Sequence, residues 1–90
     1  MAERIFIMKN YENELRKIFG SKKFEGLYKT IDSYIDRLHF AREMYSLFMW
    51  QEIEREVLAF CRELISGRYY TRETVNQLYN FIMEQGKKGR

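Results

Sequence analysis

Four side chains with metal-binding chemistry lie at helical spacing in the first half of the chain. They are Asp32, Asp36, His39 and Glu43. Their spacings of four, three and four residues place them on one side of a helix, beside its apolar stripe. Di-iron bundles need a Glu-x-x-His pair from each of two helices, and Asp36-x-x-His39 has no second such pair because the chain has one histidine. The sequence therefore predicts no metal site. It favours the simpler interpretation that these residues are ordinary polar side chains at the edge of the apolar stripe.

Catalytic chemistry has equally few candidates. His39 and Cys61 are each the only residue of their type, and they belong to no known catalytic spacing. Cys61 lies in an apolar run, as a small buried hydrophobe does. The five glycines are scattered and do not form a phosphate-binding loop. We therefore expect no catalytic residue, no cofactor and no enzymatic activity.

The cellular compartment is indicated by two weak features. One cysteine in 90 residues fits a reducing compartment. The apolar run at residues 5–8 is too short for a signal-peptide core or a membrane span. We expect a cytoplasmic protein that makes no membrane contact.

The segment 67–72 pairs two arginines with two tyrosines. Residues 67–90 hold five Lys/Arg and two Asp/Glu, whereas residues 1–66 hold eleven of each, so the last quarter supplies the whole net charge of +3. Arginine binds phosphate, asparagine bonds adenine edges and tyrosine stacks on unpaired bases. A nucleic-acid-binding regulator that uses this turn and the last helix is therefore an alternative function. The contact residues would be Arg68, Tyr69, Tyr70, Arg72 and Asn76. In the simpler alternative, the two tyrosines fold over the end of the preceding helix and the polar residues face water.

The strongest pattern is a segment, residues 27–66, that has no glycine or proline and carries apolar stripes on two opposite helical sides. A helix wetted on one side needs only one stripe, so the second must contact another helix or another chain. Aromatic residues are 17% of the chain, and Trp, Tyr and Met are enriched at interfaces. The candidate interface residues are Phe40, Met44, Leu47, Phe48, Trp50 and Leu58.

These residues predict a small interaction protein, a regulator or adaptor, that binds a protein partner and self-associates as a homodimer through this face. A thin core that uses large residues to fill itself is the alternative explanation of the same pattern.

Helix signals dominate the whole chain, which has no proline and many Glu, Lys, Arg, Leu and Met residues. We expect a first helix from about residue 3 to residue 19, ended by Gly20, with a short strand at residues 5–8 as the alternative. A second helix begins at Ser21 or at Gly26.

No loop signal then appears before residues 66–67, which would make a helix of about 60 Å at ~1.5 Å per residue. Such a rod is longer than a globule of this size. Either a second subunit covers it, or it bends near residues 39–51, at 39–41 or at 46–51. The heptad phase changes at the second of these places and favours a break there.

The last helix has a cap at Thr71 and should end at residues 85–86. Residues 87–90 are expected to form a basic disordered tail. The predicted architecture is an all-α domain of residues 1–86, with three or four helices and a long central helical segment.

Overall fold

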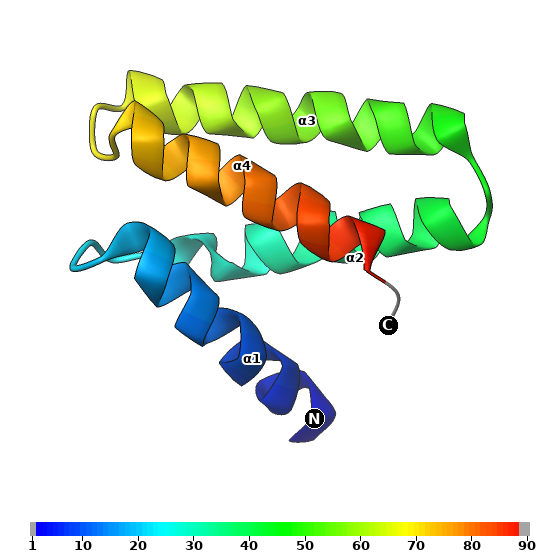
Figure 1. The fold of residues 1–90 in the computed structure, drawn as a ribbon, viewed down its shortest axis with the longest axis horizontal. Coiled ribbons are helices and arrows are strands. Elements are labelled where there is room, and N and C mark those ends of the chain that lie inside the picture. The colour runs from blue at the N-terminus through cyan, green and yellow to red at the C-terminus, as the bar shows by residue number, and fades with distance from the viewer. Residues whose placement is uncertain (1, 89–90) are drawn as a thin grey trace.

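Four α-helices and one short 3₁₀ turn make up the fold. The computed structural model describes the backbone of residues 2–88 and the side chains of residues 11–88. The elements in chain order are α1 (Ala2–Phe19), the 3₁₀ turn η1 (Glu25–Leu27), α2 (Tyr28–Glu43), α3 (Leu47–Ser66) and α4 (Arg72–Lys87) (Figure 1). No strand occurs within residues 2–88, so the predicted all-α fold is confirmed and residues 5–8 are helical.

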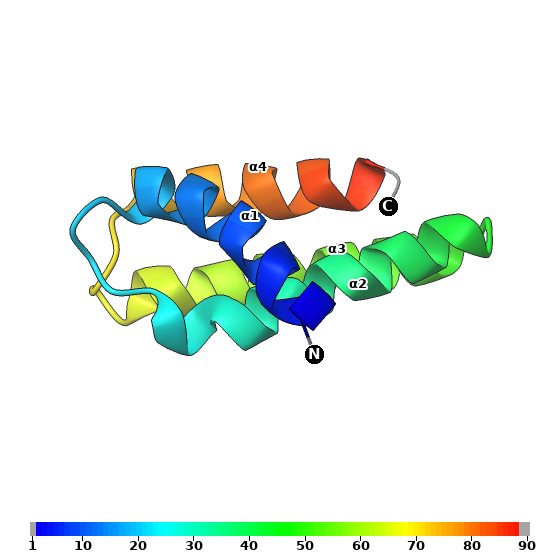
Figure 2. The same ribbon diagram turned by 90° about the horizontal axis from the view of Figure 1, so that it is seen from below.

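The helices are arranged in two layers. α2 and α3 form a hairpin, α4 packs against both of them, and α1 packs against α4. Figure 2 shows α4 in one layer and the α2–α3 hairpin in the other, and α1 runs obliquely from the level of α4 at its C-terminal end to the level of the hairpin at its N-terminal end. In both views the loop end of the hairpin projects beyond the C-terminal end of α4. This overhang leaves one end of the hairpin without a covering helix.

The core lies between the layers and is built from aliphatic side chains of all four helices. The largest fully buried side chains are Leu15, Ile31, Ile35, Leu38, Val57, Val75, Leu78 and Ile82. Each contributes about 1.5–3 kcal/mol of transfer free energy, because its apolar surface leaves water on folding. On α2 and α4 these residues recur every three or four positions, as the helical period requires.

The central segment bends between α2 and α3, so the rod alternative is wrong. The amide N–H of Ser46 donates to the Ala41 carbonyl at 2.9 Å, and the N–H of Tyr45 donates to the Arg42 carbonyl at 3.0 Å. This pattern ends a helix with a left-handed residue, and Tyr45 has a φ of +52°. The Ser46 hydroxyl then accepts from the Met49 N–H at 3.1 Å and caps α3. The bend at residues 44–46 lies inside the predicted range 39–51. It overlaps the favoured interval, residues 46–51, only at Ser46.

Two other helix boundaries need correction, whereas three are confirmed. α1 ends at Phe19 with Gly20 at a φ of +62°, and Thr71 caps α4, both as predicted. α3 ends at Ser66, also as predicted. Ser21 does not cap the second helix, because the chain continues in a loop and passes through η1, which contains Gly26, before α2 begins at Tyr28.

Gly86 does not end α4, which continues to Lys87. A Cβ at Gly86 would lie 2.7 Å from both Cβ and Cδ1 of Leu38. Glycine is present here because α4 approaches α2 closely, which has no local sequence signal. Lys87, the first residue of the predicted tail, is therefore helical, and residues 89–90 of that tail lie outside the described residues.

A search of the helices within the described part of the chain found none with the length and apolarity needed to cross a bilayer.

Candidate protein-interaction surface

The overhanging end of the α2–α3 hairpin carries a group of exposed large hydrophobic side chains, which we call the apolar tip. Its members and their exposed fractions are Phe40 50%, Met44 59%, Tyr45 95%, Leu47 69% and Phe48 67%. Four of them belong to the interface predicted from the sequence, and the structure brings these four together around one loop. Tyr45 was not predicted, because its exposure depends on the turn that only the tertiary structure shows.

Two features leave the tip exposed. α4 packs closely on α2 at Gly86 and Leu38 and ends at Lys87, so it stops short of the hairpin loop (Figure 1). Phe40 also lines the face of the hairpin that is turned away from α4, which α4 would not cover at any length. Large contiguous patches of exposed apolar side chains are typical of interaction sites.

The two other predicted interface residues are not members of the tip. Trp50 is half-buried and lines a small hollow with Tyr79 and Met83 of α4, so it contributes to the packing of α3 on α4. Leu58 is 38% exposed and lies eleven residues beyond Leu47 on α3, about three helical turns away. Of the six predicted interface residues, four therefore belong to the tip, Trp50 is partly buried beside α4, and Leu58 is exposed further along α3.

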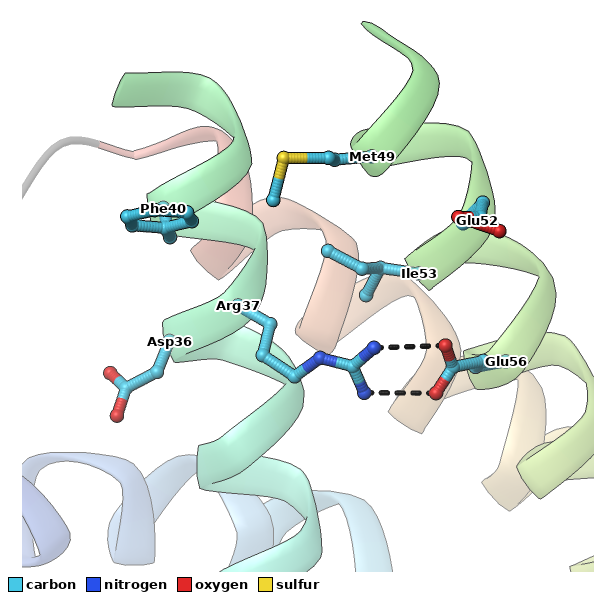
Figure 3. A pocket seen from close by; sticks show the side chains of 7 residues that line it. All are labelled: Asp36, Arg37, Phe40, Met49, Glu52, Ile53 and Glu56. Atoms are coloured by element: carbon cyan, nitrogen blue, oxygen red, sulfur yellow. Dashed lines mark hydrogen bonds and ion pairs between the residues drawn. The ribbon is translucent and has the colours of Figure 1, made fainter. Parts of the chain in front are cut away.

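A groove between α2 and α3 opens on the face of the hairpin that is turned away from α4. Its volume is about 380 Å³. Figure 3 shows Phe40 and Met49 near its loop end, Ile53 between the helices, and α4 behind them. We call this the outer groove. Its remaining lining residues are Asp36, Arg37, Glu52 and Glu56.

An ion pair crosses the outer groove at the end away from the loop. The Arg37 guanidinium donates two hydrogen bonds to the Glu56 carboxylate, each 2.8 Å long (Figure 3). These bonds lower the pKa of the Glu56 carboxyl. Because the folded-state pKa is depressed, the pair stabilises the fold above the ordinary carboxyl pKa of 4.5 and loses this effect as pH falls through the lowered value. Both side chains are about half exposed, so the effect on stability is small.

A second hollow lies on the opposite side of the tip. Its volume is about 300 Å³, and its lining residues are Ala41, Arg42, Tyr45, Ser46, Leu47 and Trp50. Leu47 and Trp50 face this hollow, whereas Met49, Glu52 and Glu56 face the outer groove. We call it the inner hollow. The tip therefore presents two different apolar surfaces, one on each side of the hairpin.

The backbone of Tyr45 makes this residue unusual. A φ of +52° is a conformation that glycine or asparagine adopts at lower cost than a bulky aromatic residue. The left-handed conformation costs about 1–2 kcal/mol for a residue with a Cβ. The Tyr45 side chain is 95% exposed, so core packing does not offset this cost.

The opposite end of the bundle contains the predicted nucleic-acid contact, and there aromatic rings pack against one another. The Phe19 ring lies 5.4 Å from the Phe24 ring and 5.1 Å from the Tyr70 ring. The Tyr70 hydroxyl donates to the Lys23 carbonyl at 2.7 Å. We call this group of Phe19, Phe24 and Tyr70 the closed end. Tyr70 thus joins the α3–α4 turn to the α1–α2 loop. It does not fold over the end of α3, as the simpler alternative had it.

The remaining predicted nucleic-acid residues are exposed beside the closed end. Arg68, Arg72 and Asn76 are exposed, and Tyr69 is about half exposed. The ammonium of Lys22 lies 4.9 Å from the centre of the Tyr69 ring. The fold therefore adds the lysines of the α1–α2 loop to the two arginines of the turn. Sequence analysis missed this juxtaposition because more than forty residues separate the two segments.

The side chains considered for metal binding and catalysis do not form a site in the described structure. Asp32 and His39 are buried, and the His39 Nε2–H donates to the Gln85 carbonyl at 2.7 Å, which joins α2 to the last turn of α4. Among residues whose side chains are described, no group of three or more His, Cys, Asp or Glu is placed to hold a metal ion. Cys61 is buried, and burial raises its pKa to about 11, so its thiol is a poor nucleophile.

Comparison of the chain with protein-family models, with curated proteins and with solved structures gave no match. Functional inference therefore depends on the surfaces of this chain alone.

Proposed function

We propose that this protein is a small non-enzymatic interaction module, a regulator or adaptor, that self-associates through the apolar tip and acts in the cytoplasm. The observation that carries the proposal is the exposure of five large apolar side chains around one loop, in a chain whose core is otherwise closed.

The size of the tip supports this proposal. At about 200 Å² for each fully exposed large side chain, the five residues present on the order of 700 Å² of surface. The largest apolar patch of a typical monomer is about 300–600 Å². A specific protein interface buries about 800 Å² on each partner. The apolar area of the whole tip is therefore comparable with one side of an interface, although it is shared between the two sides of the hairpin.

Sedimentation equilibrium over micromolar concentrations tests self-association. We expect the wild-type protein to form dimers and Met44→Glu to remain monomeric, because a carboxylate at this position would be buried without a partner. Gln77→Glu is the matched control: it adds the same charge at an exposed position of α4, far from the tip, and should leave the dimer intact. A wild-type protein that stays monomeric at all these concentrations contradicts the proposal.

A second candidate function is nucleic-acid binding, and it is favoured by the cations collected beside the closed end. Lys22, Lys23 and Arg68 lie in the two loops that the Tyr70 hydrogen bond joins, and Arg72 is the first residue of α4. Clustered Lys and Arg supply the phosphate contacts that dominate such affinity. The half-exposed Tyr69 ring offers one stacking surface.

Fluorescence anisotropy with labelled single-stranded RNA and duplex DNA tests this second candidate. Binding should weaken as salt rises and should be lost in the double variant Arg68→Ala/Arg72→Ala. Arg55→Ala/Arg62→Ala removes two exposed arginines of α3 and is the matched control. Absence of binding at moderate salt, or equal loss in both double variants, removes this candidate.

A further inference from the structure

We infer that two copies of the chain pair across the outer groove by a two-fold axis, with Phe48 of each copy seated in the outer groove of the other. This inference rests on the self-association proposed above, and it assigns the contact to one of the two surfaces of the tip.

The outer groove is bordered by exposed apolar side chains on both helices. Phe40 and Met44 are four residues apart on α2 and share one stripe of that helix. Phe48 and Glu52 are likewise four residues apart on α3, so Phe48 lies one turn closer to the loop than a residue that lines the groove. Phe48 itself does not line the groove of its own chain. It is a protruding ring beside a recess that it does not fill.

A protruding ring beside an unfilled recess is the arrangement that a two-fold contact uses. In such a contact the pairing is reciprocal: the protruding residue of each copy meets the recess of the other. The protrusion and the recess must therefore lie close together on one surface. The outer groove has a volume of about 380 Å³ and an apolar floor formed by Met49 and Ile53. This volume is at the lower end of the ~300–1,000 Å³ range of sites that hold small molecules, and it is sufficient for an aromatic ring.

The charges around the outer groove permit this burial. Arg37 and Glu56 already satisfy each other through two hydrogen bonds, so covering them leaves neither charge without a partner. Asp36 and Glu52 also line the groove, one on each helix, and the Asp36 carboxylate is directed away from α3 (Figure 3). The partner ring therefore meets Phe40, Met49 and Ile53, and the carboxylates remain at the edge.

The area of this surface indicates a weak dimer. At about 200 Å² per fully exposed large side chain, Phe40, Met44 and Phe48 present about 350 Å² of apolar surface. Interfaces are about 60% apolar, so each copy would bury about 600 Å². The total of about 1,200 Å² is the lower limit for specific interfaces, and we expect dissociation in the micromolar range.

Two adjacent and equally exposed residues provide the test. Phe48 is 67% exposed and belongs to the outer side, whereas Leu47 is 69% exposed and lines the inner hollow. We expect Phe48→Glu to be monomeric and Leu47→Glu to remain dimeric, both measured by sedimentation equilibrium beside the wild type. Both side chains are largely in solvent, so neither change should unfold the chain, and circular dichroism checks this.

The outcomes separate this inference from the function on which it rests. A monomeric wild type overturns both. A dimeric wild type in which Leu47→Glu dissociates the dimer, alone or together with Phe48→Glu, overturns the outer-groove contact and leaves self-association standing. A dimer that survives both substitutions also overturns the outer-groove contact.

Cross-linking gives a second readout that does not depend on loss of binding. A mixture of Phe40→Cys and Phe48→Cys chains, treated with a short bismaleimide, should give a mixed cross-linked dimer. Cys61 does not compete, because it is buried and its pKa is raised to about 11. A mixture of Phe40→Cys with Leu47→Cys is the control, and equal cross-linking in the two mixtures contradicts the proposed contact.

Discussion

The two ends of the bundle contain the same kinds of residue in opposite situations. At the closed end, Phe19 and Phe24 are buried and the Phe19 ring packs against both Phe24 and Tyr70. At the apolar tip, Phe40 and Phe48 are at least half exposed. The closed end joins two loops from distant parts of the chain, whereas the tip is a single turn that extends past the last residue of α4.

This difference shows that an aromatic residue becomes core or interface according to which other element reaches it. The closed end has α1 as a third partner for the aromatic residues near the α3–α4 turn. Among the described residues no third element covers the tip, which is formed by the α2–α3 hairpin alone. Substitutions of equal size at the two ends should therefore differ widely in their effects on stability.

The largest expected difference is between Phe19→Ala and Phe48→Ala. Phe19→Ala removes a buried ring and leaves a cavity, and it should lower the free energy of unfolding by about 3–5 kcal/mol. Phe48→Ala should change it by no more than about 0.5 kcal/mol, because the ring is mostly in solvent. Urea denaturation measures both, in the Met44→Glu background so that dimer formation does not add to the result. Similar losses at the two positions would show that the tip is part of the monomer core.

Gly86→Ala should have the next largest effect on the free energy of unfolding. It tests how closely α4 packs on the covered part of the hairpin. The new methyl group would overlap Leu38, and we expect a loss of about 1–3 kcal/mol even though alanine favours helices. Gly67→Ala is the control: its Cβ would make only ordinary contacts, and Gly67 has a φ of −69°. Thermal denaturation that ranks Gly86→Ala as the more stable variant would contradict the close approach of α4 to α2.

Raising the pH to 10 should lower the free energy of unfolding by about 1 kcal/mol through ionisation of Cys61. Burial raises the pKa of Cys61 from 9.0 to about 11, so the unfolded chain loses this proton first. Stability is therefore unaffected by Cys61 below pH 9 and falls as pH rises from 9 toward 11, by about 1 kcal/mol at pH 10. Chemical denaturation of the wild type and of Cys61→Ala at pH 8 and pH 10 isolates this contribution. A difference between the two proteins that does not change with pH would contradict it.

The smallest expected effect compares the turns at the two ends. Tyr45 and Arg68 have φ values of +52° and +62°, where glycine is not strained. Tyr45→Gly and Arg68→Gly should each stabilise the monomer by about 0.5–1 kcal/mol, after the larger chain entropy of glycine is subtracted from the relieved strain. Thermal denaturation checks both. If Tyr45→Gly destabilises the monomer, the ring contributes to the fold and not to an external contact.

Helix content and most helix ends were predictable because they depend on local chemistry. Gly20 ends α1, Ser46 and Thr71 cap α3 and α4, and each does so through its own backbone or a side chain within three residues. The start of α2 was missed because Ser21 is a suitable cap that the loop does not use. The end of α4 was missed because Gly86 is also a common helix terminator, and only its contact with Leu38 shows its other role.

The candidate surfaces were predictable in composition but not in placement. The sequence indicated that Phe40, Met44, Leu47 and Phe48 exceed the needs of a single buried stripe, and all four are exposed. It also grouped Trp50 and Leu58 with them: the fold places Trp50 between the inner hollow and α4, and Leu58 about three turns away from the tip on α3. The exposure of Tyr45 follows from the turn between α2 and α3, whereas the outer groove and the placement of Lys22 over the Tyr69 ring depend on contacts between separate segments, which no periodic pattern reports.

By itself the sequence determined that this protein is helical, that its central segment carries more apolar surface than one helix face can bury, and that its net positive charge comes from the last quarter of the chain. These properties follow from residue type and spacing, which act over three or four positions. Only the tertiary structure decided that the segment bends at Tyr45, that α4 stops short of the hairpin loop, and that the excess apolar surface lies uncovered at one end. The physical reason is that coverage depends on the lengths and relative positions of whole helices, which local sequence does not encode.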